Sequence, residues 1–319
     1  MEPVHKSVLF SEALDALDVH EGDTVVDMTV GGAGHFTGLV ERLGTKGTLI
    51  GIDADREAIE RASAVSVPEG VRIELIEENF RNIDAILSGL SIQSVDCVLF
   101  DLGWSSYHLT SGRGFSFRAD EPLYMTYGNP EEAEVTAADL VNSLTEEALA
   151  EIIFTLGEER FSRQIARHIV EVRHDAPILT SRLLAEVIEE AVPAWYRNRR
   201  IHPATKTFQA LRIAVNDELG EVERGIAAAM ELLAPAGRLV VVAFHSLEDR
   251  IVKQAMAAAS GRGGASRHDP TALLGRQKAA FHLLTPRALR PAEAECSVNP
   301  RARSARLRGI ARLGTEHAA

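Results

Sequence analysis

Short apolar runs alternate with longer stretches of helical periodicity over the first hundred residues of this chain. Runs rich in β-branched residues at 24–28, 48–53, 71–76 and 94–101 predict strands, and the stretches 35–42, 56–65 and 82–90 predict the helices between them. Strands and helices that alternate in this way form right-handed crossovers and a parallel sheet covered on both faces. The predicted fold class is therefore α/β.

The strand pattern stops near residue 105, and helical periodicity follows. In the stretch 158–174, Phe161, Ile165 and Ile169 fall on one helical face at four-residue spacing. The whole region is long enough to fold as a unit. We therefore expect a helical domain over residues 106–203, inserted between strands of the sheet and used for substrate recognition.

The α/β pattern resumes after the insertion. The order is a helical stretch at 205–233, a fully apolar strand at 238–244, and two weaker strand candidates at 281–284 and 304–308. These elements extend the sheet of the first hundred residues. Residues 1–105 and 204–319 together are thus predicted to form the second domain, which carries the chemistry.

The charge of the chain is uneven. A net charge of −12 argues against a nucleic-acid partner, because phosphate binding requires lysine and arginine. Two basic clusters nevertheless interrupt the acidic sequence, and their members with the strongest claim to RNA contact are Arg199, Arg200, Lys206, Arg301 and Arg303. The alternative is that both clusters are solvated surface. Arg306 and Arg308 continue the second cluster on a strand expected at the sheet edge, where they too could face phosphates.

Bulk composition indicates a globular protein. Apolar residues make up 45% of the chain, and no run approaches the roughly 18 apolar residues of a membrane span. The N-terminus shows no export signal, and Cys97 lies in an apolar run where a buried thiol is the simplest interpretation. We expect a cytoplasmic protein that contacts no membrane.

A glycine turn, Gly31-Gly32-Ala33-Gly34-His35, separates the first strand from the first helix. Glycine lets the backbone bend sharply and approach a ligand closely. Asp53 ends the next strand, 22 residues beyond Gly31, where a carboxylate can bind ribose hydroxyls. The turn lacks the G-x-G-x-x-G spacing of dinucleotide folds, yet these features alone leave both NAD and S-adenosylmethionine open.

Two further strand ends carry candidate chemistry. Phe80 follows the third strand, where an aromatic ring can stack on adenine, and Asp101 ends the fourth, followed by Ser105. Methyl transfer from a sulfonium needs in-line approach and exclusion of water, and it needs no metal. Asp101 or Ser105 could accept hydrogen bonds from an exocyclic amine and so activate it. For Asp101, an orienting or capping role is the alternative.

His245 closes the strand at 238–244. The segment Phe244-His245-Ser246-Leu247-Glu248-Asp249 starts a helix, so Ser246 is expected as its N-cap, with Asp249 three residues on. No second ligand stands at metal spacing, so we predict no metal. His245 remains a candidate catalytic residue at the rim of the site.

Several motifs together resemble those of the RsmH (MraW) family, in family order and over nearly the whole chain. They are Asp27–His35, Asp101–Ser106, Gly112–Phe117, Gly157–Phe161, Thr205–Leu219, Phe244–Arg250 and Asn299–Ser304. The resemblance implies a class I (Rossmann-like) methyltransferase sheet with an inserted helical domain. It implies methyl transfer from S-adenosylmethionine to N4 of a cytidine in the decoding region of 16S ribosomal RNA. The partners would be that RNA or the small ribosomal subunit, and the resemblance permits a homodimer.

The same resemblance assigns the cofactor site to Gly32 through His35, with Asp53, Phe80, Asp101 and His108. The chain departs from the family pattern at His108, which replaces a common Gln, and at Phe36, which replaces Ser. Residues 121–127 stand where many members have P-L-D-M-R-M, so an acid and an arginine are lost. One alternative is therefore a non-catalytic RNA-binding ribosome assembly factor that keeps the cofactor site. Another is a nicotinamide oxidoreductase.

Overall fold

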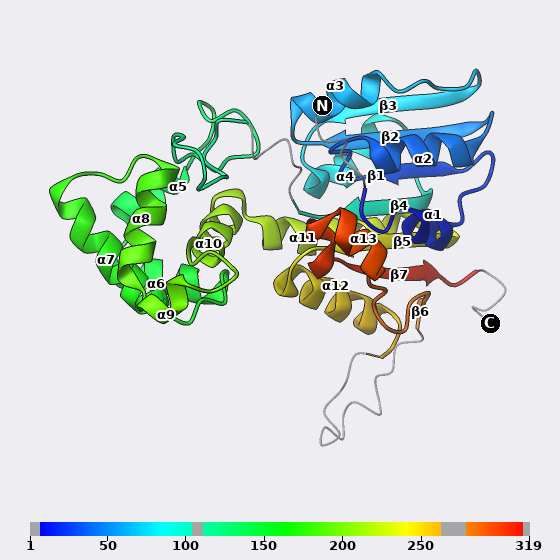
Figure 1. The fold of residues 1–319 in the computed structure, drawn as a ribbon. Coiled ribbons are helices and arrows are strands. Elements are labelled where there is room, and N and C mark those ends of the chain that lie inside the picture. The colour runs from blue at the N-terminus through cyan, green and yellow to red at the C-terminus, as the bar shows by residue number, and fades with distance from the viewer. Residues whose placement is uncertain (1–6, 104–110, 263–278, 315–319) are drawn as a thin grey trace. The chain divides into compact units, whose positions relative to one another are not determined.

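A computed structural model of the chain describes residues 7–103, 111–262 and 279–314. It divides into two compact units, one built from residues 1–104 and 219–319 and the other from residues 105–218. Figure 1 shows a twisted sheet with helices in the first unit and helices alone in the second. Among the described residues, none of the helices is long and apolar enough to cross a membrane.

The first unit is built on a seven-stranded sheet in the order β3-β2-β1-β4-β5-β7-β6. Its strands are β1 (Thr24–Asp27), β2 (Gly47–Asp53), β3 (Val71–Glu77), β4 (Val95–Asp101), β5 (Leu233–Ala243), β6 (Phe281–Leu283) and β7 (Arg306–Arg312). The first five are parallel, and β7 runs antiparallel to both β5 and β6. The strand order reverses at β1, so the carboxyl ends of β1 and β4 form the edge where open α/β sheets bind ligands. The expected α/β, Rossmann-like sheet is confirmed.

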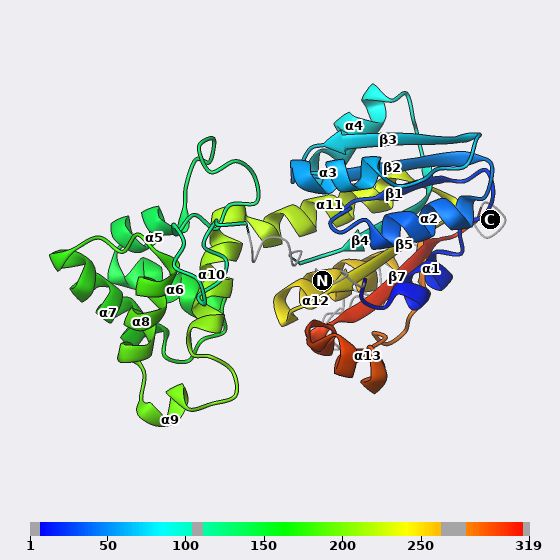
Figure 2. The same ribbon diagram turned by 45° about the horizontal axis from the view of Figure 1, so that its top comes forward.

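Helices cover both faces of this sheet. The helices are α1 (Phe10–Leu17), α2 (Gly34–Leu43), α3 (Arg56–Ser63), α4 (Ile83–Gly89), α11 (Glu218–Leu232), α12 (Ser246–Ala259) and α13 (Glu293–Val298), with short 3-10 turns η1 (Phe80–Asn82) and η4 (Pro300–Ser304). Val25 and Leu99 face the core under α1, α2 and α3, which Figure 2 shows on one side of the strands. Their neighbours Val26 and Val98 face the core under α4, α11 and α12. The period of two along each strand thus accounts for the unbroken apolar runs.

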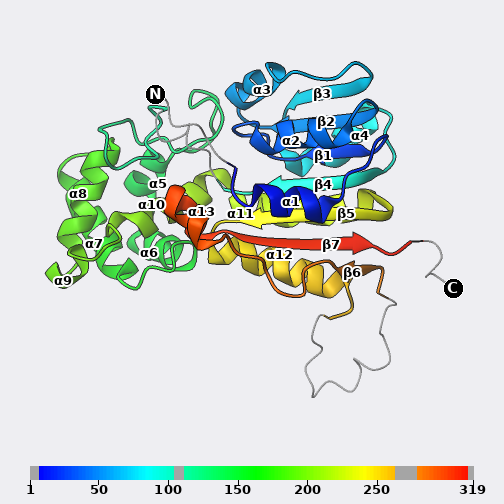
Figure 3. The ribbon, with the colours of Figure 1, turned by 45° about the vertical axis from the view of Figure 1, so that its right-hand side comes forward.

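Strand β7 corrects one expectation. The segment 304–308 was expected at the edge of the sheet, whereas β7 lies between β5 and β6 (Figure 3). It pairs along its whole length with β5, and Phe281 of β6 pairs with Arg312 on its other side. The short β6 is the edge strand, which limits the row of unpaired backbone groups left open to other chains.

The second unit is a helical bundle. Its helices are α5 (Ala137–Ser143), α6 (Glu146–Thr155), α7 (Ser162–Asp175), α8 (Ser181–Ala191), α9 (Ala194–Arg197) and α10 (Ala204–Asn216). Asp217, with a left-handed φ of 46°, ends α10, so the stretch 205–233 is two helices rather than one. Phe208 and Leu211 of α10 are buried in the core of the bundle. The structural unit therefore extends to residue 218, whereas the sequence-based boundary at 203 assigned α10 to the other domain.

Cys97 lies within β4 and packs in the core under α1. Both Cys97 and Cys296 are free. Burial raises the pKa of the Cys97 thiol to about 12, so the thiol stays protonated. Cys97 is thus the small buried apolar side chain that the sequence predicted.

Candidate active site

The glycine turn connects β1 to α2 at the carboxyl edge of the sheet. Gly31 and Ala33 both have left-handed backbones, with φ of 50° and 59°. A Cβ on Gly34 would lie 2.2 Å from the hydroxyl oxygen of Ser7, so a side chain at the first residue of α2 would displace that hydroxyl. Ala33 is the N-cap of α2 and provides no side-chain hydrogen bond. The start of this helix is therefore left uncapped by its own side chains, as an anion-binding helix end requires.

Two side chains from the next strand and helix brace this turn. The Gly31 N–H donates to Asp53 Oδ2 at 2.8 Å, and Arg61 Nε donates to the Gly31 carbonyl oxygen at 3.0 Å. Asp53 Oδ1 also accepts the Asp55 N–H at 2.8 Å. These contacts place the Asp53 carboxylate beside the glycine turn, and its binding of ribose hydroxyls stays a prediction. Arg61 was missed by the sequence analysis, because an arginine inside a surface helix gives no signal of its own.

Asp101 ends β4 and forms an ion pair with His35. The distance from His35 Nδ1 to Asp101 Oδ2 is 3.2 Å, and the Asp101 N–H donates to Thr29 Oγ1 at 2.7 Å. His35 is 3% exposed and stacks on Phe10, with ring centroids 5.8 Å apart. Asp101 Oδ1 is buried and has no hydrogen-bond partner in the part of the chain that the structure describes. One oxygen of Asp101 is therefore fixed by the protein, and the other is a buried acceptor without a partner among the described residues.

A second buried acid, Asp27, completes this charged group. Burial raises the pKa of Asp27 to about 7, although the nearby His35 and the Thr29 N–H act in the opposite direction. Burial by itself would lower the pKa of His35, but Asp101, and to a smaller extent Asp27, outweigh it and raise that pKa. An imidazolium between two carboxyl groups is thus favoured. The sequence analysis assigned His35 to the cofactor and did not foresee its contact with Asp101.

Phe80 lies in η1 at the end of β3. Its ring meets Phe100 edge-on at 5.4 Å, and a Cβ on Gly225 of α11 would come within 2.7 Å of it. The neighbouring Asn79 donates to Glu221 of the same helix at 2.6 Å. These contacts fix the ring at the carboxyl edge of the sheet. Its stacking on adenine remains a prediction.

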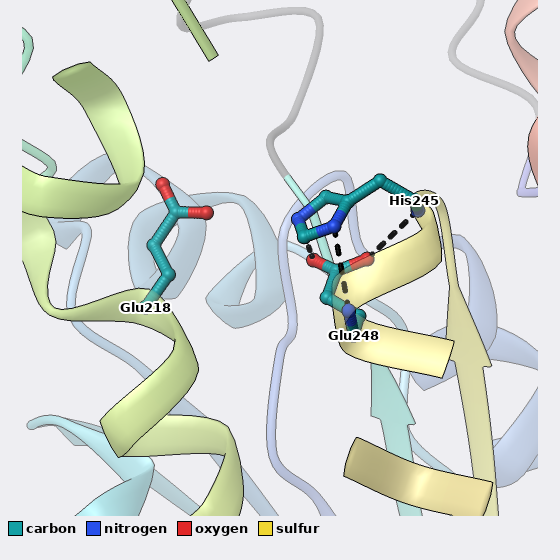
Figure 4. A group of neighbouring side chains, drawn as sticks. All are labelled: Glu218, His245 and Glu248. Atoms are coloured by element: carbon teal, nitrogen blue, oxygen red, sulfur yellow. Dashed lines mark hydrogen bonds and ion pairs between the residues drawn. The ribbon is translucent and has the colours of Figure 1, made fainter. Parts of the chain in front are cut away.

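His245, rather than Ser246, is the N-cap of α12. The His245 Nδ1 accepts the Glu248 N–H at 3.3 Å, and Glu248 Oε2 accepts the N–H groups of Phe244 and His245 at 2.8 and 3.1 Å. Figure 4 shows this reciprocal arrangement, a capping box with histidine at the position usually held by serine or threonine. The expected Ser246–Asp249 box is therefore wrong. His245 thus caps the start of α12. Its role as a catalytic residue at the rim of the site stays a prediction.

Ser105 and His108 lie outside the residues that the structure describes. Their predicted roles, in catalysis for Ser105 and in cofactor binding for His108, therefore stay predictions. The backbone at Gly103, with φ of 95°, is the last described position before them.

The basic cluster near the C-terminus divides into paired and unpaired arginines. Arg306 and Arg308 both bind Asp249, at 2.6 and 2.7 Å, and together they lower its pKa against the effect of burial. Both arginines thus share a carboxylate, which the sequence did not show, and their contact with phosphates stays a prediction. Arg303 is exposed, and the side chain of Arg301 is not described.

The basic cluster of the helical unit also has internal partners. The Arg199 guanidinium lies over the rings of Trp195 and Tyr196, 5.7 and 5.3 Å from their centroids. Lys206 Nζ donates to the Glu158 carbonyl oxygen at 2.6 Å, whereas Arg200 is exposed. Exposed arginine stacked on aromatic rings is compatible with RNA contact. Lys206 is the member of this cluster with a clear structural role.

The variant segment 121–127 is built into the helical unit. The Met125 N–H donates to the Arg113 carbonyl oxygen at 2.8 Å, and the Tyr127 hydroxyl donates to Glu218 at 2.8 Å. Glu218 also receives a bidentate pair from the buried Arg212, at 2.8 and 2.9 Å. The segment is therefore a well-bonded part of this unit despite its departure from the family pattern.

Comparison with known proteins bears on this site. The model of the MraW methylase family matches residues 2–313. A protein named ribosomal RNA small subunit methyltransferase H from Syntrophotalea carbinolica is 46% identical over 310 residues, which is 97% of this chain and 98% of that protein. The protein of the same name from Acidiphilium cryptum is 48% identical over 313 residues, which is 97% of this chain and 97% of that protein. The one from Desulforapulum autotrophicum is 44% identical over 306 residues, which is 95% of this chain and 97% of that protein. With a match over nearly its whole length, this chain belongs to the MraW methylase family.

Proposed function

We propose that this chain transfers a methyl group from S-adenosylmethionine to N4 of a cytidine in the decoding region of 16S ribosomal RNA. The observation that carries the proposal is the Asp101 carboxylate of a methylase-family chain. One of its oxygens is held by His35, and the other is buried without a hydrogen-bond partner among the described residues. The names of the relatives support ribosomal RNA of the small subunit as the substrate. The choice of N4 and of the decoding region rests on the motif resemblance.

The residues present fit S-adenosylmethionine. The uncapped start of α2 offers backbone N–H donors and a positive helix end to the cofactor's carboxylate. The Asp53 carboxylate lies beside the turn, where it can accept the ribose hydroxyls, and the Phe80 ring lies at the end of β3, where it can stack on the adenine. The cofactor residues are accordingly Gly31 to His35 with these two side chains and Asp101, joined by His108 beyond the described residues.

The reaction needs a better nucleophile than free cytosine. S-adenosylmethionine supplies an electrophilic methyl group, and S-adenosylhomocysteine is the product that leaves. The exocyclic amine is weak because its lone pair is delocalised into the ring. Asp101 Oδ1 accepts an amino hydrogen, which favours a tetrahedral nitrogen with an available lone pair, and then takes the proton that the methylated nitrogen must lose. His35 holds Asp101 Oδ2 and so fixes the direction of Oδ1.

Recognition of the RNA is assigned to the exposed arginines and to the helical unit. Arg199, Arg200 and Arg303 are exposed on the two units and can contact phosphates. Lys206 and Arg301 remain candidates from the sequence. We also keep as predictions a cytoplasmic location and a homodimer.

The experiment uses unmodified small ribosomal subunits and S-adenosylmethionine labelled in its methyl group. Label should enter the RNA with the wild-type chain and should be lost with Asp101→Asn. Cofactor affinity is measured in parallel, because Asp101 is assigned to both binding and catalysis. RNA binding by the wild-type chain with no label transferred would refute the proposal and favour an assembly factor.

A further inference from the structure

A cavity of about 120 Å³ opens at the start of α12, within the sheet unit. Its lining comes from three separate segments of the chain and includes Arg290, Arg303, Arg306, His245, Ser246 and Ser304. The volume is about four times the 30 Å³ that a water molecule occupies in the liquid, which is enough for a tetrahedral oxyanion. Three guanidinium groups around so small a space require an explanation in a chain with net charge −12.

Two of the three arginines have no side-chain partner among the described residues. Arg290 and Arg303 are exposed, and neither forms a hydrogen bond or ion pair through its side chain with any other described residue. Arg306 shares the carboxylate of Asp249 with Arg308. Arg290, Arg303, Arg306 and Arg308 together thus carry more positive charge than the single carboxylate of Asp249 offsets.

Glu248 lies in the first turn of α12 and does not line the cavity. Glu248 is 2% exposed, and its carboxylate is occupied by the backbone N–H groups of Phe244 and His245. The start of α12 is thus already satisfied by the capping box, and the positive charge at the cavity comes from the arginines. Guanidinium groups favour an anion with several acceptor oxygens.

The strand register places this cavity at the catalytic edge of the sheet. Asp101 of β4 pairs with Val242 of β5, and Val242 pairs with Leu307 of β7, the residue next to Arg306. Two strand spacings separate the backbones of Asp101 and Leu307, a distance of about 10 Å. The cavity therefore lies close to the Asp101 end of β4.

We propose that this cavity binds a phosphate of the RNA backbone, next to the nucleotide whose base is presented to Asp101. Arg290 and Arg303 donate to the phosphate oxygens, and Arg306 contributes the part of its guanidinium not bound to Asp249. The inference rests on the proposed function, since it names how the same site holds its RNA. It explains why two arginines beside this cavity have no side-chain partner among the described residues.

The test is the salt dependence of RNA binding by the full chain, with a single-stranded oligoribonucleotide as the probe. The double variant Arg290→Gln/Arg303→Gln should bind about tenfold more weakly at 0.1 M salt, and the slope of log K against log salt should become shallower by about 0.7, the value for one phosphate contact on a single strand. Arg262→Gln is the matched control, because Arg262 is an exposed arginine beyond the opposite end of α12. It should change neither quantity.

Two further measurements make the outcome decisive. S-adenosylmethionine affinity should be the same in all variants, which shows that the sheet unit is folded. Unchanged RNA affinity and salt slope in the double variant would overturn the proposal, whether or not methyl transfer occurs. Arginine-dependent binding of inorganic phosphate without any effect on RNA would overturn it too, because the cavity would then take a free anion. A loss of salt slope in a chain that transfers no methyl group would keep the cavity assignment and reject the proposed function.

Discussion

Replacing Asp27 by asparagine should make the stability of the protein less sensitive to pH. Burial raises the pKa of Asp27 from 3.8 to about 7 in the folded protein. Between these two pH values the folded chain holds a proton that the unfolded chain has released, so the free energy of unfolding falls as the pH rises. The fall is about 1.4 kcal/mol per pH unit and amounts to ~4 kcal/mol above pH 7.

His35 acts in the same direction. Its pKa is raised in the folded protein, so the stability it contributes is complete below its unfolded value of about 6.5 and is lost as the pH rises through its folded value. Asp27→Asn removes the first contribution and weakens the second, because Asp27 helps to raise the pKa of His35. The asparagine also keeps an oxygen for the Thr29 N–H, which donates to Asp27 Oδ1 at 3.1 Å.

The assay is equilibrium denaturation by urea at several pH values between 5 and 9. As the pH rises from 5 to 9, the free energy of unfolding of Asp27→Asn should rise by ~3 kcal/mol relative to that of the wild-type chain, and most of this change should occur below pH 7. Asp175→Asn makes the same substitution at a side chain that is 93% exposed, and it serves as the control. Parallel pH profiles for the wild-type and Asp27→Asn chains would refute the account of this buried group.

Three other substitutions test the surroundings of the site. Gly34→Ala should destabilise the sheet unit by ~1–3 kcal/mol in denaturation experiments, because the new Cβ would overlap the Ser7 hydroxyl. Arg61→Ala removes the donor that holds the Gly31 carbonyl, and it should weaken S-adenosylmethionine binding about tenfold in a calorimetric titration while leaving the fold intact. Asp249→Asn should lower the free energy of unfolding by about 3 kcal/mol at pH 7. This difference from the wild-type chain should shrink as the pH falls through the lowered folded-state pKa of Asp249, because the wild-type chain then loses the same ion pairs.

Most of the fold could be predicted from the sequence because the two periodicities are strong. Strands β1, β2 and β4 are largely buried, so their apolar runs stand out from the helical stretches around them. The edge strand β3 is only partly buried. The break between α10 and α11 was missed, because the left-handed Asp217 interrupts no hydrophobic pattern. The place of β7 inside the sheet was missed as well, since the order of strands depends on pairing partners far apart in the chain.

The candidate site was only partly predictable. Glycine and acidic residues at strand ends identified the turn, Asp53 and Asp101, because these positions follow from the topology of a parallel sheet. The His35–Asp101 pair could not be predicted, since it joins two segments through side-chain directions that local patterns do not encode. Charge patterns were the least informative. Arg306 and Arg308 looked free in the sequence, yet both bind Asp249.

The most direct test of the central claim is to identify the nucleoside that receives the methyl group. Unmodified small ribosomal subunits are incubated with the chain and labelled S-adenosylmethionine, and the RNA is then digested and analysed by mass spectrometry. The account predicts one labelled nucleoside, N4-methylcytidine, within the decoding region, and none with Asp101→Asn. Label in another nucleoside, or in ribosomal protein instead of RNA, would contradict it.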